Sequence, residues 1–381
     1  MEDNRLISAL SDREHEDFRA EVQAFGKEYI APYAVELEAR EAFPSEIIKE
    51  MGKRGWMGIP IPKEYGGAGL DNLSYIIAVE EISRVCGSTG ITLAAHTSLV
   101  VWPIYTHGNE AQKKKYLIPL ACGEHIGAFA LTEPNAGSDA GATETMAVLQ
   151  GDHYVVNGTK LFITNGTYAD AVIITASHDR SKGVHGISAF IVEKGTPGFE
   201  PVKKEDKLGL RASDTAELSF EDCKISRKNL LGVENEGFKV FMETLDGGRI
   251  SIGALALGEA QGALDAAIQY AREAGLKKSQ VVQEEIADMA MEVSAARHLI
   301  YHTARLKDQK LTVTLEGAIA KLYASEVSMR VTSKAMDIIG LEGLTKKYPV
   351  ERFFRDAKLN EIGEGTSEIQ RIVIARQVLG K

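Results

Sequence analysis

Apolar residues in the first third of the chain recur with the period of helices. Residues 14–30 place their apolar side chains on one helical face, and Pro32 follows where a helix would end. Residues 90–101 are apolar almost all round, which predicts a buried helix. Further helices are expected over residues 45–51, 73–85 and 111–122. The pattern therefore predicts an N-terminal helical domain over residues 1–125.

The period changes to alternation after Gly127, which predicts a middle β domain over residues 126–232. Strands are expected over residues 172–175, 187–192 and 215–220. Residues 150–153 separate two alternating runs, and Asn157 followed by Gly158 is a hairpin signal. Short strands with glycine and proline between them favour an antiparallel barrel or sandwich. A Rossmann fold is not expected, because no Gly-x-Gly-x-x-Gly follows a strand and opens a helix.

Helical spacing returns near Gly237 and continues towards the C-terminus. Helices are expected over residues 254–272, 284–306 and 315–339, with a last helix from Ser367. We predict a C-terminal four-helix bundle over residues 233–381. The fold class is then α+β, with a β domain between two helical domains. The helices that begin near Ala254 and Leu315 are apolar enough to bury a subunit interface.

Composition and charge narrow the function classes. With 381 residues the chain exceeds one ordinary hydrophobic core, which agrees with several domains. Its formal net charge of −10 argues against nucleic-acid binding, which needs a basic face. No apolar run is long enough to cross a bilayer, and the acidic start predicts no signal peptide. The scattered cysteines predict a cytoplasmic protein without disulfides and without a metal site: Cys86, Cys122 and Cys223.

The candidate chemistry centres on Glu364, which stands between Gly363 and Gly365. Glycines let a backbone turn sharply and approach a ligand closely, and a carboxylate on such a turn is a candidate general base. Ser367 and Gln370 fit a capping box, so a helix N-terminus able to bind an anionic group should follow. Taken alone, a glutamate between glycines is more often an exposed loop residue.

Five segments of the chain, in this order, resemble the acyl-CoA dehydrogenases, and most closely their short-chain, butyryl-type members. The segments are residues 129–139, 162–166, 204–213, 245–249 and 364–370. The resemblance covers nearly the whole chain. It implies a helix–β–helix fold with FAD between the β domain and the C-terminal bundle.

The resemblance also implies roles for single residues. Glu364 matches the base that removes the α-proton of an acyl-CoA thioester. Residues that match FAD contacts are Phe129, Leu131, Thr132, Gly137, Ser138, Phe162, Thr164, Gln280, Thr366 and Glu368. Residues that match acyl-CoA contacts are Ser138, Asp246, Arg249 and Gly365. Without the resemblance, Thr132 would be interpreted as a turn opener and Arg249 as a solvated helix residue.

The family precedent implies a complete reaction and its partners. Glu364 takes the α-proton, the β-hydrogen leaves as hydride to FAD, and electrons pass to electron-transfer flavoprotein. One branch of the family carries its base just before the arginine of the 245–249 segment. That position is Gly248 here, so Glu364 is the one candidate. The family assembles as homotetramers, as dimers of dimers. Two alternatives stay open: an enoyl-CoA reductase working with a flavoprotein partner, and a non-redox acyl-CoA-binding protein that has lost FAD.

The chain departs from the family pattern at three places. The segment from Tyr270 to Gln280 is about five residues shorter than usual, and Leu341 and Glu342 replace parts of a glycine-rich run. Both changes predict a weaker site for the adenylate half of FAD. Gly363 replaces a common tyrosine, which predicts an open pocket that favours branched, cyclic or aromatic acyl groups over butyryl.

Overall fold

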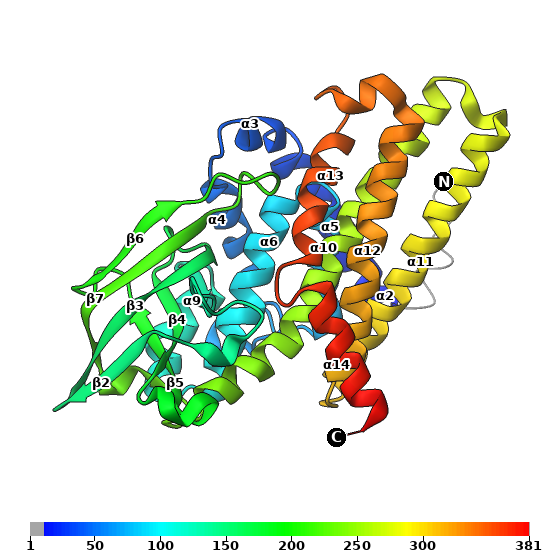
Figure 1. Ribbon diagram of the computed structural model, residues 1–381. Coiled ribbons are helices and arrows are strands. Elements are labelled where there is room, and N and C mark those ends of the chain that lie inside the picture. The colour runs from blue at the N-terminus through cyan, green and yellow to red at the C-terminus, as the bar shows by residue number, and fades with distance from the viewer. Residues whose placement is uncertain (1–10, 381) are drawn as a thin grey trace.

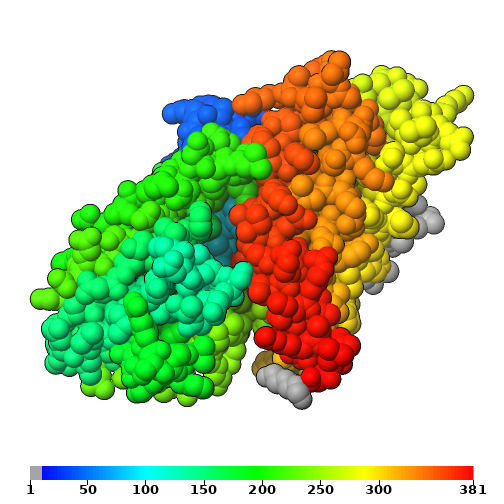
Figure 2. Space-filling view, in the orientation of Figure 1, coloured from blue at the N-terminus to red at the C-terminus, as the bar shows by residue number. Residues whose placement is uncertain are grey.

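The computed structural model describes residues 11–380. Figure 1 shows a sheet on one side, long helices on the other, and N-terminal helices between them. The space-filling view shows a recess between the sheet region and α14 (Ser367–Leu379), in front of α6 (Gly87–His96) (Figure 2). The three parts of the chain meet around this recess. No helix within residues 11–380 is long and apolar enough to cross a membrane.

The N-terminal region is helical, as predicted. Its elements after α2 (Arg13–Phe25) are α3 (Ala34–Ala39), α4 (Ser45–Lys53), α5 (Asn72–Ser83), α6, α7 (Trp102–His107), α8 (Glu110–Gln112) and α9 (Ile118–Ala121). The side chain of Asp71 caps α5 by accepting from the amide of Ser74 at 2.8 Å. Every residue of α6 is buried, in agreement with its apolar pattern. A π-helical turn over Thr97–Val101 joins α6 to α7, and such turns often mark functional positions.

The middle region forms one open eight-stranded sheet. The strands are β1 (Gly127–Ala130), β2 (Met146–Gln150), β3 (His153–Thr164), β4 (Ala171–Ser177), β5 (Ile187–Glu193), β6 (Phe199–Lys204), β7 (Thr215–Ser226) and β8 (Leu230–Leu231). Their order is β6-β7-β3-β2-β4-β5-β8, with β1 paired to β4. The predicted fold class is confirmed. The sheet does not close into a barrel, however, and β1 and β2 pair with β4 in parallel.

The predicted hairpin at Asn157 and Gly158 is wrong. Both residues lie inside the continuous strand β3, at a register shift against β7. The turn instead lies between β2 and β3, where Gln150 faces His153. A Cβ at Gly158 would collide with the side chain of Thr145, so this glycine allows close strand packing.

Three long helices dominate the C-terminal region: α10 (Gly237–Glu273), α11 (Gln280–Asp308) and α12 (Thr314–Ile339). The shorter helices α13 (Val350–Ala357) and α14 pack against α12. Glycines on α10 allow close contact with α5. A Cβ at Gly258 would collide with the carbonyl oxygen of Glu80, and one at Gly262 with that of Arg84.

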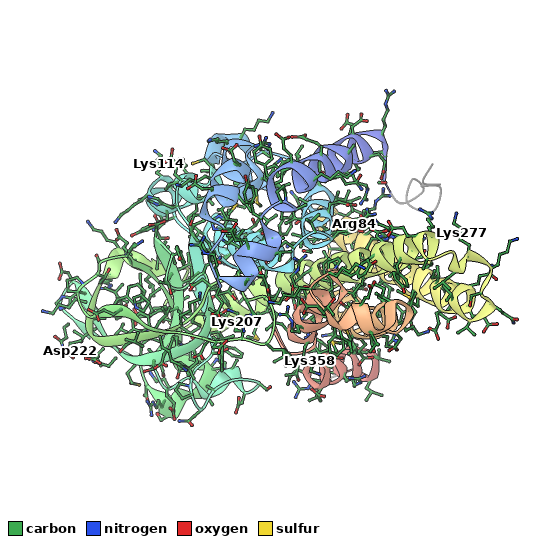
Figure 3. The ribbon with its side chains drawn as sticks, turned by 90° about the horizontal axis from the view of Figure 1, so that it is seen from above. Arg84, Lys114, Lys207, Asp222, Lys277 and Lys358 are labelled. Atoms are coloured by element: carbon green, nitrogen blue, oxygen red, sulfur yellow. The ribbon has the colours of Figure 1, made fainter. Side chains whose placement is uncertain are left out.

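Hydrophobic cores join the three regions. One core contains buried residues of α5 and α10, among them Ile77 and Leu257. Another joins the N-terminal helices to the sheet and to α10, through residues such as Ile173 and Phe241. Seen from above, the loop that carries Lys207 approaches the segment that carries Lys358 (Figure 3). There the guanidinium of Arg355 donates to the carbonyl oxygen of Leu208 at 3.0 Å. The sheet is thereby fixed to the helix that precedes Glu364.

Candidate active site

Glu364 lies on a strained turn between α13 and α14. Its φ is +54° and that of Gly365 is +97°. A left-handed backbone is costly for a residue with a Cβ, so other contacts must hold the turn. The Gln370 amide donates to the carbonyl oxygens of Glu364 at 3.3 Å and Gly365 at 2.9 Å. The ammonium of Lys321, on α12, donates to the same Gly365 oxygen at 2.6 Å.

The predicted helix begins at Ser367, but the predicted capping box does not form. Thr366 is the N-cap, and its hydroxyl accepts from the amide of Ile369 at 3.3 Å. The Gln370 side chain instead bonds the turn, and the hydroxyl of Ser367 is buried without a hydrogen-bond partner among residues 11–380.

The carboxylate of Glu364 faces the backbone of α10. A Cβ at Gly248 would collide with Oε2 of Glu364 and would lie 2.8 Å from Cδ2 of Leu99. Leu99 belongs to the π-helical turn. Oε2 is buried and has no hydrogen-bond partner in the described chain. Gly248 therefore provides the space that the Glu364 carboxylate occupies.

Burial raises the pKa of Glu364 to about 7, although the nearby cations of Lys321 and Arg249 oppose the rise. A carboxyl group with this pKa is part ionised near neutral pH. It can take a proton from a weak carbon acid and later release it.

Arg249 lies close to this carboxylate on α10, and Asp246 lies one turn before it on the same helix. The Arg249 guanidinium is buried and donates to Oδ1 of Asp246 at 2.5 Å, and its Nε has no partner in the described chain. Oδ2 of Asp246 accepts from the hydroxyl of Thr314 at 2.7 Å. Arg249 is therefore not a solvated helix residue. It contributes positive charge and an unused donor close to Glu364.

Five of the residues predicted to line a flavin lie on the sheet side: Phe129, Leu131, Thr132, Phe162 and Thr164. Phe129 in β1 stacks on Phe241 of α10 with a centroid distance of 4.1 Å. The carbonyl oxygen of Thr132 accepts from the amide of Leu161 at 2.8 Å, which brings the Leu131–Thr132 segment against the β3 residues Phe162 and Thr164. The ring of Phe162 is 63% exposed on a backbone with φ +58°. The sheet thus presents an exposed aromatic ring close to the half-buried Thr132.

A buried ion pair behind this segment was missed by the sequence analysis. The ammonium of Lys160 donates to Oε1 of Glu133 at 2.6 Å, to the hydroxyl of Thr175 at 2.9 Å and to the carbonyl oxygen of Leu131 at 3.2 Å. The Glu133 carboxylate also accepts from the amides of Glu144 and Thr145. The pair fixes the Leu131–Thr132 segment from the inside of the sheet.

Other predicted residues stand apart from these two groups. Gly137 and Ser138 are exposed in the loop after β1, and a Cβ at Gly137 would meet nothing within 4 Å. Gln280 is the exposed first residue of α11, and its amide donates to Glu284 at 2.9 Å. Within residues 11–380, no hydrogen bond or ion pair joins Gln280 to Glu364 or Thr132. Glu368 is exposed on α14, one turn from the base.

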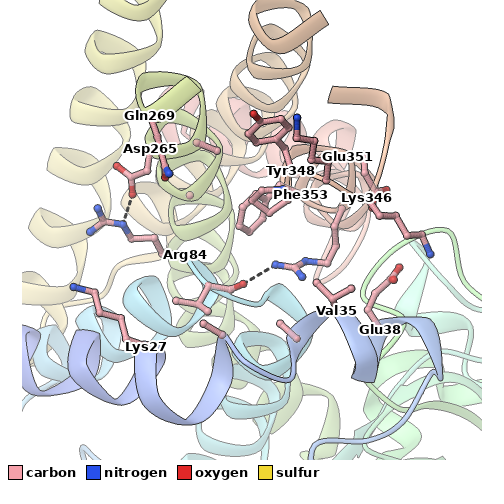
Figure 4. A pocket seen from close by; sticks show the side chains of 18 of the residues that line it. Lys27, Val35, Glu38, Arg84, Asp265, Gln269, Lys346, Tyr348, Glu351 and Phe353 are labelled. Atoms are coloured by element: carbon pink, nitrogen blue, oxygen red, sulfur yellow. Dashed lines mark hydrogen bonds and ion pairs between the residues drawn. The ribbon is translucent and has the colours of Figure 1, made fainter. Parts of the chain in front are cut away.

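A cavity of about 610 Å³ lies elsewhere, between the N-terminal helices, α10 and α13 (Figure 4). None of the predicted site residues lines it. Across it Arg84 bonds Asp265 at 2.5 Å, and Arg352 donates to the carbonyl oxygen of Val85 at 2.8 Å. In the part of the chain that the structure describes, no cluster of three metal-ligating side chains occurs, and all three cysteines are free.

Comparison with known proteins agrees with this arrangement over the whole chain. Residues 12–124, 128–223 and 235–379 match the N-terminal, middle and C-terminal domain models of acyl-CoA dehydrogenase. A short-chain specific acyl-CoA dehydrogenase of Clostridium acetobutylicum is 54% identical, over 96% of this chain and 98% of that protein.

Two solved structures have the same fold. Butyryl-CoA dehydrogenase from Megasphaera elsdenii superposes with a TM-score of 0.95 at 45% identity, covering 97% of this chain and 99% of that one. A chain from a structure described as the electron transferring flavoprotein of Acidaminococcus fermentans superposes with a TM-score of 0.96 at 50% identity, with the same coverage. On these grounds, the chain belongs to the acyl-CoA dehydrogenase family.

Proposed function

We propose that this chain is an FAD-dependent dehydrogenase that converts an acyl-CoA thioester to the trans-2-enoyl-CoA, with Glu364 as the base. One observation carries the proposal. The carboxylate of Glu364 is held by a strained turn against Gly248, where burial raises its pKa to about 7 and Oε2 has no hydrogen-bond partner within residues 11–380. A buried carboxylate with an unused oxygen is poised to accept a proton from a ligand.

The residues around Glu364 have different roles in proton removal. Gly365 and Thr366 open a helix N-terminus whose amides suit the anionic oxygen that develops when a thioester loses its α-proton. Arg249 and Lys321 contribute positive charge that favours the carboxylate form of Glu364 before the reaction. Leu99 and Gly248 exclude water from one side of the carboxylate. Asp246 fixes Arg249 in this arrangement.

The sheet side fits a flavin. The flavin ring of FAD needs an apolar surface with polar groups at its edge, and the pyrophosphate of FAD needs room beside the backbone. Phe162 offers the exposed ring, Thr132 the hydroxyl and Gly137 the open loop. FAD would be held by Phe129, Leu131, Thr132, Gly137, Ser138, Phe162, Thr164, Thr366 and Glu368, and Gln280 would serve the FAD of a second subunit. When bound, FAD supplies the acceptor for the β-hydrogen.

The comparisons support an electron-transfer partner and a short acyl group. The likeness to a chain from a structure described as an electron transferring flavoprotein supports an electron-transfer flavoprotein as the partner. Short-chain and butyryl relatives support a short acyl group. Enoyl-CoA reduction would use the same residues in reverse. The retained sheet-side residues argue against a protein that has lost FAD. A homotetramer, a cytoplasmic location and domain boundaries near residues 125 and 232 remain predictions.

The test is Glu364→Gln, which keeps the size of the side chain and removes its basicity. Anaerobic reduction of the flavin by butyryl-CoA should slow by several orders of magnitude, while FAD content and acyl-CoA binding persist. Glu36→Gln, on α3 and paired at the surface with Arg40 at 2.9 Å, is the control and should keep the rate. A loss of tenfold or less in Glu364→Gln would remove Glu364 as the base.

A further inference from the structure

Lys321 is a buried cation that the predicted site did not include. It lies in the middle of α12, its side chain is fully buried, and small residues such as Ala320 and Ala324 surround it on the helix. Its ammonium donates to one protein acceptor in the described chain, the carbonyl oxygen of Gly365. Burying an ammonium group with a single backbone acceptor lowers the stability of the fold, which indicates that Lys321 has a further role.

The bond from Lys321 falls on the turn that presents the base. Glu364 and Gly365 both have left-handed backbones, and the Gly365 carbonyl oxygen is held by Lys321 from α12 and by Gln370 from α14. The turn is therefore tied both to its own helix and to a central helix of the bundle. Loss of the Lys321 bond would free the turn to relax towards unstrained backbone angles.

The charge of Lys321 acts on the same carboxylate. Glu364 is faced by Lys321 from α12, by Arg249 from α10 and by the phenol of Tyr75 from α5. Lys321 itself is faced by Arg249 and by three carboxylates, those of Glu361, Glu364 and Glu368. Arg249 is paired with Asp246, whereas Lys321 has no salt bridge within residues 11–380. The field of Lys321 is therefore less compensated than that of Arg249.

We propose that Lys321 is a positioning residue that acts through Glu364, by anchoring its turn at the Gly365 carbonyl and by favouring its ionised form. The inference rests on the proposed role of Glu364 as the base. Two physical effects are combined in one side chain. The hydrogen bond sets where the carboxylate lies, and the charge sets the pH at which the carboxylate is ready to accept a proton.

Three substitutions separate these effects. Lys321→Met removes bond and charge, Lys321→Gln keeps a donor without charge, and Lys321→Arg keeps the charge. The control is Lys334→Met on the same helix, where the lysine pairs at the surface with Glu285 and Asp288. The holoenzymes are mixed anaerobically with butyryl-CoA between pH 5.5 and 9, and the rate of flavin reduction is recorded against pH.

We expect the midpoint of the rate profile to rise by about one pH unit or more in Lys321→Met and Lys321→Gln, which is about tenfold in rate on the acidic limb. Lys321→Arg should keep the midpoint near that of the wild type, and Lys334→Met should leave the profile unchanged. A folded Lys321→Gln enzyme with the wild-type midpoint would overturn the role of the charge. If Lys321→Met does not fold, the Gln and Arg variants still decide the question.

A second readout does not depend on turnover. In the Lys321→Met holoenzyme, Glu364 ionises at high pH without the neighbouring cation, and a buried unpaired carboxylate destabilises the fold. The double variant Lys321→Met, Glu364→Gln should therefore have a higher Tm than Lys321→Met alone, and the gain should be larger at pH 8.5 than at pH 5.5. An equal change in Tm at both pH values contradicts the inference.

The experiments distinguish failure of the Lys321 proposal from failure of the base assignment. If Glu364→Gln keeps its rate, the base assignment fails. If Glu364→Gln is inactive and the Lys321 profiles match the wild type, the Lys321 proposal alone fails.

Discussion

Lys160 in the sheet and Lys321 in the helical bundle are both fully buried, and burial lowers the pKa of each to about 8. Their surroundings differ. Lys160 donates to a carboxylate, a hydroxyl and a carbonyl group, and the carboxylate of Glu133 is itself satisfied by backbone amides. In the described part of the chain, Lys321 has one backbone acceptor, and the neighbouring Glu364 and Arg249 each keep a buried polar atom without a partner.

The difference teaches how one fold uses buried charge in two ways. A buried network with every donor and acceptor satisfied is rigid and specifies one arrangement, which suits the surface that would support a flat ring. A buried cluster with unused atoms is held at a cost and can interact with a ligand. The sheet side is therefore a scaffold, and the bundle side holds the reactive group.

The largest expected effect breaks the scaffold. Lys160→Met leaves the Glu133 carboxylate buried without its cation, which should lower the free energy of unfolding by about 3–5 kcal/mol. Lys321→Met breaks one bond to a carbonyl group and should cost about 1–2 kcal/mol. Chemical denaturation of both variants checks the order. Adding Glu133→Gln to Lys160→Met should recover part of the loss, and a Lys160→Met variant as stable as Lys321→Met contradicts the comparison.

Acid should weaken the contact between the helices and the sheet next. Burial lowers the pKa of His96, on α6, to about 4, and its ring bonds the amide of Gly127 in β1 and the carbonyl oxygen of Leu120. Because the folded pKa lies below the usual 6.5, stability is full above pH 6.5 and falls towards pH 4, by up to about 3 kcal/mol. Tm measured from pH 7.5 to 4 should show the fall, and His96→Gln should reduce it. A wild-type Tm that stays constant over this range is the contrary result.

Gly248→Ala tests whether Glu364 needs the space that the missing side chain of Gly248 leaves. The new methyl group would collide with Oε2 of Glu364 and displace the carboxylate, so flavin reduction by acyl-CoA should slow about a hundredfold, or about 2.7 kcal/mol. Gly253→Ala on the same helix is the control, because its methyl group would make ordinary contacts with Ile300 at 3.4 Å. Equal rates in the two variants would show that Glu364 tolerates a side chain beside it.

The smallest effect concerns the acyl group. A Cβ at Gly363 would lie 3.5 Å from the Leu359 carbonyl oxygen, so the position accepts a side chain. We expect the wild type to oxidise isobutyryl-, cyclohexanoyl- and phenylpropanoyl-CoA with a higher kcat/KM than butyryl-CoA. Gly363→Tyr should lower kcat/KM for the bulky esters by about fourfold per excluded methylene, from about 0.8 kcal/mol each, and spare butyryl-CoA. A panel in which the substitution changes nothing rejects the open pocket.

The sequence predicted those features that local patterns encode. The periodicity of α5, α6 and α12 identified them because each keeps one pattern over many residues. The Gly-Glu-Gly turn was predicted because glycine at a sharp bend has few other uses. The Asn157–Gly158 pair misled, since the same dipeptide suits a hairpin or a bulge, and the paired strand that selects the bulge is distant in sequence.

Contacts between distant residues account for what the sequence missed. Lys160 in β3 meets Glu133 in the loop after β1, and Lys321 in α12 meets Gly365 in the turn before α14, so neither local spacing nor composition indicates either pair. A charged residue among the small side chains of α12 was a signal, because such a lysine must either reach solvent or find an acceptor. The cap at Thr366 was missed by one residue because Thr366 and the adjacent Ser367 both carry a hydroxyl group that could cap the helix.

Helix α10 runs without interruption from the sheet into the bundle. Phe241 stacks on the sheet residue Phe129, and Gly248 seats Glu364 seven residues further along. The distance and the rotation between the sheet side and the Glu364 side of the site are therefore set by the number of residues between Phe241 and Gly248 on α10. Inserting a single residue between Phe241 and Gly248 would turn every later position by about 100° and advance it by about 1.5 Å. A change in the length of this stretch would therefore misalign Glu364 with the sheet.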